Sequence, residues 1–83
     1  MNFVYMIRCV DGTIYVGHTK NPEAREKEHN AGRGARYTAI RRPVCLVYAE
    51  ALQSVEASVR RELQLKRWSL AKKEALIAGD VER

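Results

Sequence analysis

The stretch FVYMIRCVDGTIYVG, residues 3–17, decides the fold of this chain. Its first apolar run, residues 3–9, is rich in large and branched side chains that favour β-structure, and so is the TIYVGH run at 13–18. The Asp11-Gly12 dipeptide between the two runs is typical of a tight turn. The stretch therefore predicts a β-hairpin.

The length of the hairpin loop decides which face each tyrosine takes. A two-residue turn would pair Tyr5 with His18 and would put Tyr15 on the opposite face of the ribbon. A three-residue loop, closed by a left-handed Gly12 in a bulge, would instead pair Ile7 with Tyr15, so that both tyrosines share one face. The sequence leaves both registers open, and a site that uses both tyrosines requires the second.

Capping residues mark the elements that follow the hairpin. Asn21 before Pro22 is typical of a helix start, and Gly32 is typical of the end of that helix. Ser54 and Ser69 are placed to cap two later helices. In chain order, the expected elements are a helix from Asn21 to about Ala31, a basic loop over 33–43, a strand over 44–51, a helix from Ser54 to near Trp68, and a short helix from Ser69 to Gly79.

The order of these elements, β-β-α-β-α-α, predicts an α+β fold with a three-stranded antiparallel sheet flanked by helices. The chain has 83 residues, which suffice for one modest core, so we expect a single domain over 1–83 with its core at about 2–78. Trp68 is expected to pack between the last two helices. Any active site then has to lie on the surface of this one unit.

The composition is that of a soluble domain with an excess of positive charge. No apolar run approaches the roughly 20 residues that span a bilayer, and the N-terminus lacks the features of a signal peptide, so we expect a cytoplasmic protein with no membrane partner. Cys9 and Cys45 lack metal-ligand spacing and are expected to be reduced thiols buried in strands. Fifteen Lys and Arg against ten Asp and Glu give a formal net charge of +5, which favours nucleic acid as the partner.

Two helical segments carry side chains that suit chemistry. Arg25 and His29 are four residues apart on the first helix and therefore share a face, although the charged residues around them also favour a plain solvated surface. Glu62 lies at the edge of the apolar stripe of the long helix, where an unpaired buried carboxylate is costly. Glu62 either pairs with Lys66 one turn later or faces a cation in a cleft, and both alternatives stay open.

The basic loop over 33–43, RGARYTAIRRP, suggests contacts with a nucleic-acid backbone. Its tyrosine, Tyr37, either stacks on a base, hydrogen-bonds to a phosphate, or packs against the edge of the sheet. The candidate nucleic-acid contacts are Arg33, Arg36, Tyr37, Arg41, Arg42 and Lys66.

The tripeptides FVY at 3–5 and YVG at 15–17, followed by Arg25, resemble in order and spacing the motifs of the GIY-YIG nuclease superfamily. The motif departs at Phe3, where the superfamily pattern has glycine. The resemblance covers nearly the whole chain and implies the same fold as the element order. Further similarity, to the small stand-alone single-domain bacterial branch of largely uncharacterised proteins, lies in EHNAGRGARYT at 28–38, RRPVCLVYAEA at 41–51 and RRELQLKRWSLAKKEAL at 60–76.

The resemblance implies a metal-dependent endonuclease that hydrolyses phosphodiester bonds in DNA with one divalent ion, Mg²⁺ or Mn²⁺. Glu62 is then the metal ligand, and His18 is a further candidate because some relatives, such as nucleotide-excision-repair nucleases, carry a lysine after the YIG motif. A tyrosine whose pKa is lowered by nearby cations, or else the histidine of the first helix, would act as general base. The catalytic residues carried over by motif are Tyr5, Tyr15, Arg25, His29 and Glu62.

We expect the specificity for DNA to come from a protein partner or from the shape of the substrate, because 83 residues leave no room for a second, DNA-recognising domain. We therefore expect branched or damaged DNA as substrate, as in DNA repair, or a protein partner that supplies specificity, and a chain that acts as a monomer or weak dimer. The rival interpretation is a non-catalytic nucleic-acid-binding module of the same fold. A protein-binding adaptor would need an exposed apolar surface, for which Trp68 is the only lead.

Overall fold

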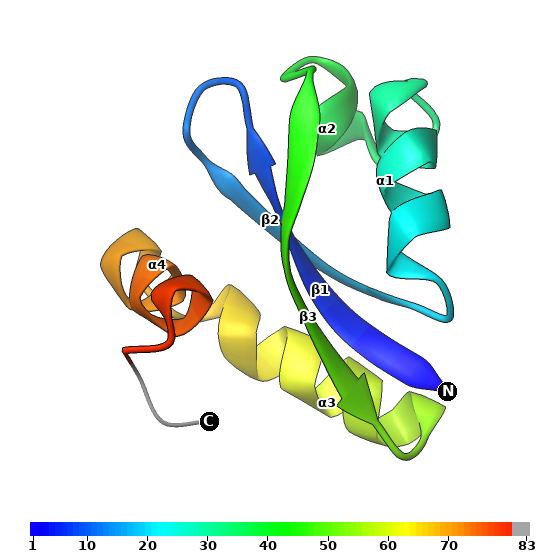
Figure 1. The fold of residues 1–83 in the computed structure, drawn as a ribbon, viewed down its shortest axis with the longest axis vertical. Helices are drawn as coiled ribbons and strands as arrows, with labels where there is room; N and C mark the ends of the chain where they lie inside the picture. Colours follow the sequence, from blue (N-terminus) through cyan, green and yellow to red (C-terminus); the bar gives the residue numbers. More distant parts are fainter. Residues whose placement is uncertain (81–83) are drawn as a thin grey trace.

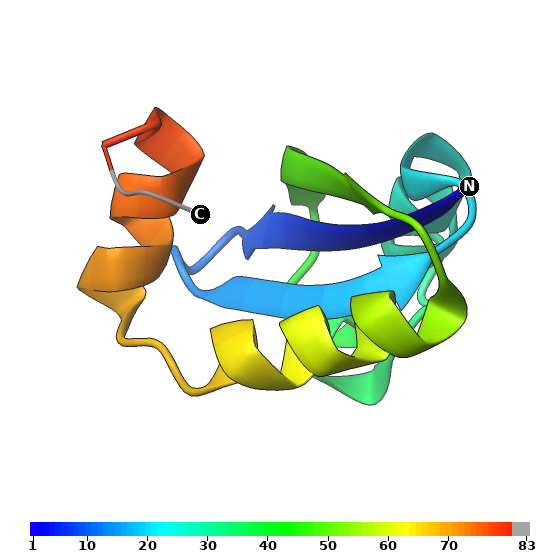
Figure 2. The ribbon, with the colours of Figure 1, turned by 90° about the horizontal axis from the view of Figure 1, so that it is seen from below.

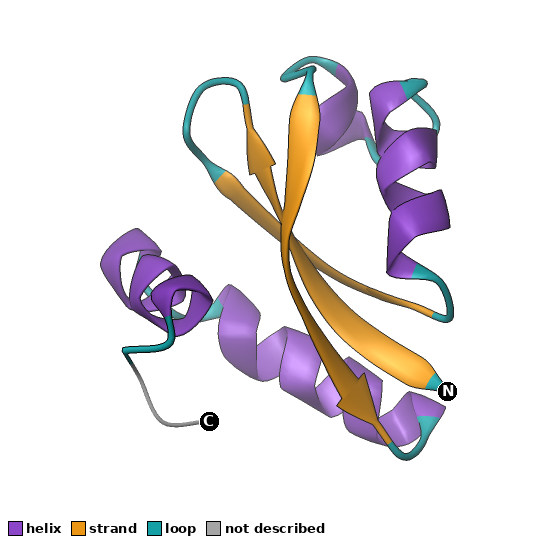
Figure 3. Ribbon diagram, viewed as in Figure 1, coloured by secondary structure: helices purple, strands orange, loops and turns teal. Residues whose placement is uncertain are grey.

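The computed structural model describes residues 1–80 and shows a three-stranded sheet with helices packed on both of its faces (Figure 1, Figure 3). The strands are antiparallel and stand in the order β2-β1-β3, so that the first strand is the central one. This architecture confirms the predicted α+β fold. The elements are β1 (Asn2–Cys9), β2 (Ile14–Thr19), α1 (Pro22–Asn30), α2 (Arg36–Ala39), β3 (Val44–Leu52), α3 (Val55–Lys66) and α4 (Leu70–Ala78).

The hairpin between β1 and β2 has the three-residue loop, which is the second of the two predicted registers. Gly12 has a φ of +86°, and its N–H donates to the carbonyl of Cys9 at 2.9 Å. Ile7 pairs with Tyr15 across the ladder. Tyr5 and Tyr15 are therefore on the same face of the sheet, which is the arrangement that a shared site requires.

The two faces of the sheet carry different cores, because alternate side chains of β1 point to opposite sides. Val4 and Met6 lie on the face covered by α3 and α4, which we call the α3 face, and Figure 2 shows α3 running along it. Tyr5 and Ile7 lie on the face covered by α1 and α2, which we call the α1 face. The buried cluster of the α3 face comprises Val4, Met6, Ile14, Val16, Tyr48, Leu65 and Leu76.

The helix caps follow the sequence prediction. The side chains of Asn21, Ser54 and Ser69 each accept a hydrogen bond from a backbone N–H of the first turn of α1, α3 and α4. Gly79 closes α4 with a φ of +83°. These bonds satisfy N–H groups that have no partner inside the helix.

Three details differ from the prediction. The basic loop contains the single-turn helix α2, which has no side-chain cap at Ala35 and is held by tertiary contacts instead. Helix α3 ends at Lys66, two residues before Trp68. The half-buried ring of Trp68 packs against the core with Arg61 of α3 and Lys72 of α4 over it, which agrees with its predicted place between the last two helices. Cys45 is exposed rather than buried, because it points outward from β3, whereas Cys9 is buried as expected. Within residues 1–80 no helix is long and apolar enough to cross a membrane.

Candidate active site

A cleft of about 200 Å³ lies beside the edge strand β2. It draws residues from both faces of the sheet, since the tyrosines belong to the α1 face whereas Glu62 is carried by α3 and reaches the cleft around the edge of β2. The predicted catalytic residues therefore meet in one cleft, except for His29, which is fully buried behind Tyr5. The lining residues are Tyr5, Tyr15, Gly17, His18, Arg25, Gly34 and Glu62.

Two larger hollows in the surface carry no comparable chemistry. One, of about 420 Å³, lies on the outer side of α3 over Leu63 and Trp68, with arginines at its rim. The other, of about 380 Å³, lies beside Met1 at the end of β3. Neither is lined by a carboxylate, a histidine or a tyrosine, so the smaller cleft is the candidate site.

A chain of buried hydrogen bonds leads away from the cleft. The hydroxyl of Tyr5 lies 2.8 Å from Nε2 of His29, and Nδ1 of His29 lies 2.7 Å from the hydroxyl oxygen of Thr38. The Thr38 hydroxyl in turn donates to the backbone carbonyl of Ala35 at 3.1 Å. The imidazole and the threonine are fully buried, so only the tyrosine end of this chain meets the cleft.

Burial controls the ionisation of the two groups at the start of this chain. It raises the pKa of Tyr5 above its ordinary value, with Tyr15 adding to the rise and Arg25 opposing it. The prediction that nearby cations lower the pKa of the base tyrosine is therefore wrong for Tyr5, because desolvation of the phenolate outweighs the cation. Burial, followed by Arg25, lowers the pKa of His29, so its imidazole is neutral at pH 7.

Arg25 offers the cleft a cation with unfilled hydrogen-bonding capacity. Its Nε is buried and, among the described residues, has no hydrogen-bond partner. The nearest carboxylate oxygen, on Glu28, lies 3.7 Å away in a loose ion pair. A buried unpaired donor on a charged group is costly, and an anion in the cleft would remove that cost.

Glu62 combines the two alternatives that the sequence left open. One carboxylate oxygen is bonded to Nδ1 of His18, and the other lies 2.7 Å from Nζ of Lys66. Burial alone would raise the pKa of Glu62, but the hydrogen bonds from Lys66 and His18 outweigh it, and the pKa is lowered. Glu62 is therefore an ionised carboxylate at neutral pH that both forms the predicted ion pair and lines the cleft.

The residues fit a divalent cation held by a single carboxylate. In the part of the chain that the structure describes, no three His, Cys, Asp or Glu side chains come together as a metal cage. Mg²⁺ commonly binds proteins through one or two carboxylates and completes its shell with water and substrate phosphate oxygens. Glu62, ionised and facing the cleft, is such a ligand, and a cation would compete there with Lys66 and His18.

Tyr15 joins the buried chain to the basic loop through ring contacts. Its ring lies edge-on to His29 with centroids 5.3 Å apart, and it stacks on Tyr37 with centroids 6.1 Å apart. The guanidinium of Arg41 lies 3.9 Å from the centre of the Tyr37 ring. Tyr37 thus packs on Tyr15 of the edge strand β2, which is one of the predicted alternatives, while 39% of the residue stays exposed.

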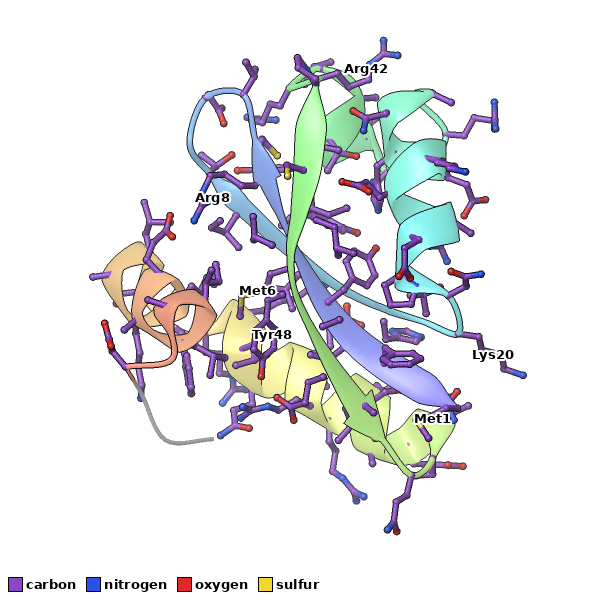
Figure 4. The ribbon with its side chains drawn as sticks, viewed as in Figure 1. Met1, Met6, Arg8, Lys20, Arg42 and Tyr48 are labelled. Carbon is purple, nitrogen blue, oxygen red and sulfur yellow. The ribbon has the colours of Figure 1, made fainter. Side chains whose placement is uncertain are left out.

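The arginines of the basic loop fall into two pairs. Arg41 is bonded to Asp11 and to the carbonyl of Tyr37, and Arg42 donates to two backbone carbonyls at the end of the molecule formed by α1 and α2 (Figure 4). Arg33 and Arg36 are exposed, and their side chains make no hydrogen bond or ion pair within residues 1–80. Only the second pair is free to meet a phosphate without breaking a contact.

The structure adds residues that the sequence reasoning did not place in the site. A Cβ on Gly17 would overlap the hydroxyl of Tyr5, and a Cβ on Gly34 would overlap the ring of His29, so glycine is required at both places for the rings to fit. A lone threonine in a loop carries no chemical signal of its own. What could have pointed to Thr38, Gly17 and Gly34 is their place within the motifs YVG and GARYT.

Comparison with known proteins gives a family match over most of the chain. The model of the GIY-YIG catalytic domain matches residues 1–75. UPF0213 proteins from Staphylococcus aureus strain Mu3 and from Staphylococcus haemolyticus are 43% and 46% identical to this chain over 76 residues, which cover 92% of this chain and 93% of each relative.

Two solved structures have the same fold and related sequences. The solution structure of the UPF0213 protein BH0048 from Bacillus halodurans is 42% identical, with a TM-score of 0.59 over 94% of this chain and 84% of that one. The solution structure of the protein EF2693 from E. faecalis is 34% identical, with a TM-score of 0.62 over 94% of this chain and 83% of that one.

Proposed function

Since this chain belongs to the GIY-YIG catalytic domain family, we propose that its cleft hydrolyses phosphodiester bonds in DNA with the help of one divalent cation, Mg²⁺ or Mn²⁺. The observation that carries the proposal is the buried Nε of Arg25, which has no hydrogen-bond partner within residues 1–80 and belongs to a side chain that lines the cleft together with Tyr5 and Glu62. A cation for phosphate, a hydroxyl backed by a base, and a carboxylate for metal are what phosphodiester hydrolysis needs.

The attacking water would lose its proton to Tyr5. A free phenolate is disfavoured because burial raises the pKa of Tyr5. Its oxygen nevertheless accepts a proton from water if its own proton passes to Nε2 of His29, 2.8 Å away, in the same step. After this step the water oxygen is bonded to phosphorus as a hydroxyl group, and His29 is an imidazolium. Tyr5 is neutral before and after the step.

The negative charge of the phosphorane-like transition state would be stabilised by Arg25 and by the cation that Glu62 would hold. The Arg25 guanidinium would bind a non-bridging oxygen through its Nε, for which the described residues supply no hydrogen-bond acceptor. Glu62 would hold the divalent cation, and a bound cation would stabilise the negative charge that develops on the phosphoryl group and on the leaving group. Tyr15 lines the same cleft and would position the phosphate through its hydroxyl.

The rim of the cleft would bind the backbone on either side of the cut. Arg33 and Arg36 flank the lining residue Gly34 in sequence and have no side-chain partner among the described residues, so they would take neighbouring phosphates. Contacts of this kind reach the backbone and not the base edges, so we propose selection by DNA structure, such as a branch or a damaged site. Lys66 would join these contacts only when the cation displaces it from Glu62.

One observation favours the rival function, a binding module without catalysis. Both carboxylate oxygens of Glu62 are already paired, with His18 and Lys66. If these basic side chains keep the place of a metal, the cleft would bind phosphate through its cations alone. The two functions differ in their need for a divalent ion. Cleavage requires it, whereas simple binding does not.

The deciding experiment incubates the chain with flapped, branched, nicked and single-stranded DNA, in Mg²⁺, in Mn²⁺ and in EDTA. We expect cleavage of at least one branched or nicked substrate with either metal and none in EDTA. Tyr5→Phe should reduce the rate by roughly 10²- to 10⁴-fold, as expected for loss of a general base. Binding to every substrate without cleavage in any metal would favour the binding module.

The matched control is Tyr48→Phe. Tyr48 is also a buried tyrosine whose hydroxyl is bonded, in this case to Glu50, but it belongs to the cluster of the α3 face (Figure 4). It lines no part of the cleft. Its variant should keep the wild-type rate, so a fall in both variants would point to damage of the fold and not to loss of the base.

A further inference from the structure

The buried hydroxyl of Thr38 makes two contacts that together favour one direction for its hydrogen. Thr38 is fully buried, and its oxygen lies 3.1 Å from the carbonyl oxygen of Ala35 and 2.7 Å from Nδ1 of His29. A carbonyl oxygen only accepts hydrogen bonds, so both contacts can be hydrogen bonds at the same time only if the single hydroxyl hydrogen points to Ala35. In that arrangement Thr38 offers a lone pair to the imidazole.

The direction of this hydroxyl selects one form of the imidazole. With Thr38 donating to Ala35, Nδ1 of His29 is the donor to Thr38, and a neutral imidazole carries a single ring hydrogen. Nε2 is then bare and faces the hydroxyl of Tyr5, from which it accepts. In the other tautomer the Thr38 hydroxyl would have to turn away from Ala35 to donate to the bare Nδ1, so the Thr38–Ala35 hydrogen bond would be lost inside a dry site.

We propose that Thr38 is a positioning residue that holds His29 in the tautomer with hydrogen on Nδ1, and so keeps Nε2 ready to accept the proton of Tyr5. The catalytic consequence rests on the proposed function, whereas the tautomer is a property of the folded chain alone. When the proton moves, one O–H bond of Tyr5 breaks and one N–H bond forms on Nε2. The resulting imidazolium donates to Thr38 through Nδ1 as before, so the Thr38 bond does not have to rearrange.

The geometry around α2 explains how one turn of helix can hold this hydroxyl in place. Thr38 closes the turn by donating to Ala35, three residues earlier, and Gly34 lies flat against the imidazole where a Cβ would overlap it. The helix has no side-chain cap of its own, so its contact with His29 is a main support. The same contact therefore orients the imidazole and fixes the turn.

The test measures the tautomer directly by nitrogen NMR of the histidine side chains at neutral pH. The chain has two histidines, His18 and His29, so one variant, His18→Gln, assigns the spectrum. In the wild type we expect hydrogen on Nδ1 of His29. Thr38→Ser keeps the hydroxyl and should keep this tautomer. Thr38→Val keeps the shape of the side chain without the acceptor, and it should give a mixture of the two His29 tautomers or the tautomer with hydrogen on Nε2.

Cleavage is the second readout. Loss of one buried hydrogen bond to the base chain should lower the rate of Thr38→Val by roughly 10- to 100-fold, and Thr38→Ser should recover most of it. Ser58→Ala is the matched control, because Ser58 is a buried helical hydroxyl bonded to its own helix carbonyl, away from the imidazole. That variant should keep both the tautomer and the rate.

Two results would overturn the proposal. One is hydrogen on Nε2 of His29 in the wild type, and the other is an unchanged tautomer in a folded Thr38→Val protein. Both are read without any substrate. A chain that cleaves no DNA at all would end the proposed nuclease function, and the NMR result would still decide the role of Thr38.

Discussion

The two faces of the sheet use neighbouring residues of β1 in opposite ways. On the α3 face, Val4 and Met6 are fully buried among aliphatic side chains, and such packing mainly stabilises the fold. On the α1 face, Tyr5 is just as buried, but its hydroxyl starts a chain of hydrogen bonds through His29 and Thr38. Polar groups in a dry interior destabilise the fold unless each finds a partner, and the hydrogen bonds of this chain supply partners for the buried hydroxyls and the imidazole.

The comparison teaches where each kind of substitution should act. Truncating an aliphatic residue of the α3 face removes packing and should lower stability without touching the chemistry of the folded molecule. Changing a polar residue of the cleft or of its buried chain should lower the proposed activity far more than stability. Glu62 is the useful exception, because it is carried by α3 and yet lines the cleft.

The largest expected effect is on cleavage by Glu62→Gln. The amide keeps the shape of the side chain but removes the charge that would hold a divalent ion, so the rate should fall at least about a thousandfold. Stability should change by less than about 1 kcal/mol, since the lost ion pair with Lys66 is largely exposed on the lysine side. A nicking assay in Mg²⁺ and a urea titration measure the two quantities.

Glu50→Gln is the matched control for this variant. The carboxylate of Glu50 is 13% exposed against 14% for Glu62, and it is likewise paired with a basic side chain, Arg61, at 3.2 Å. It lies outside the cleft, so its variant should cleave at the wild-type rate. If Glu62→Gln cleaves normally, Glu62 is not a metal ligand and its role reduces to the ion pair with Lys66.

The next effect is on stability and comes from Leu65→Ala. Leu65 is fully buried in the cluster of the α3 face, and truncation of a buried leucine costs about 2–5 kcal/mol. The urea midpoint should fall accordingly, while the cleavage rate per folded molecule stays the same. If the Leu65→Ala protein cleaves more slowly than the wild type under conditions where both are fully folded, the packing of the α3 face also affects the cleft.

The third effect is a dependence of stability on pH. The pKa of His29 is lower in the folded chain than its ordinary value of about 6.5 in the unfolded chain. Below about pH 6.5 the unfolded chain therefore binds more protons than the folded chain, and this favours unfolding. Stability should be complete above about pH 6.5 and decline as the pH falls toward the lowered pKa, by at most about 1.4 kcal/mol per pH unit. The groups that face this imidazole are Tyr5 of β1, Tyr15 of β2, Arg25 and Glu28 of α1, and Thr38 of α2.

Urea titrations between pH 5 and 7.5 measure this decline, and His29→Gln is the reference that lacks the titrating group. The difference between the two proteins should show the slope even if other groups titrate. Glu62 also has a lowered pKa, but a carboxylate contributes its slope at lower pH. Equal slopes for both proteins would mean that His29 titrates alike in the folded and unfolded chain.

The sequence predicts the strands, helices and caps well because each depends on local signals. Asn21-Pro22, Ser54 and Gly79 act within one turn of chain, and the alternating apolar residues of the hairpin need only their neighbours. The hairpin register was undecided because both loop lengths suit Asp-Gly, and only a packed α1 face selects one. Local signals also could not give α2, since its support comes from His29, nine residues earlier.

The candidate site was predictable as a set of residues but not as a set of contacts. Motif order singled out Tyr5, Arg25 and Glu62, and they do line one cleft. The direction of the Tyr5 pKa was missed, because residue types show which charges are near but not how deeply a hydroxyl is buried. Thr38 was missed for the same reason, as its importance lies in the orientation of one hydroxyl.

The smallest expected effect, on the salt dependence of DNA binding, divides the basic loop as the structure does. Arg33 and Arg36 have no side-chain partner in residues 1–80, so each can neutralise a phosphate and release a counterion. Replacing either with alanine should flatten the slope of log affinity against log salt by roughly one unit. Stability should not change, since no contact of the fold is lost.

Arg42→Ala is the contrasting variant, because the Arg42 side chain donates to the carbonyls of Ala39 and Asn30 and so connects α2 to α1. We expect it to lower stability and leave the salt slope nearly unchanged. Equal slope changes in all three variants would show that the ties of Arg42 give way to DNA, and that the basic loop acts as one electrostatic surface.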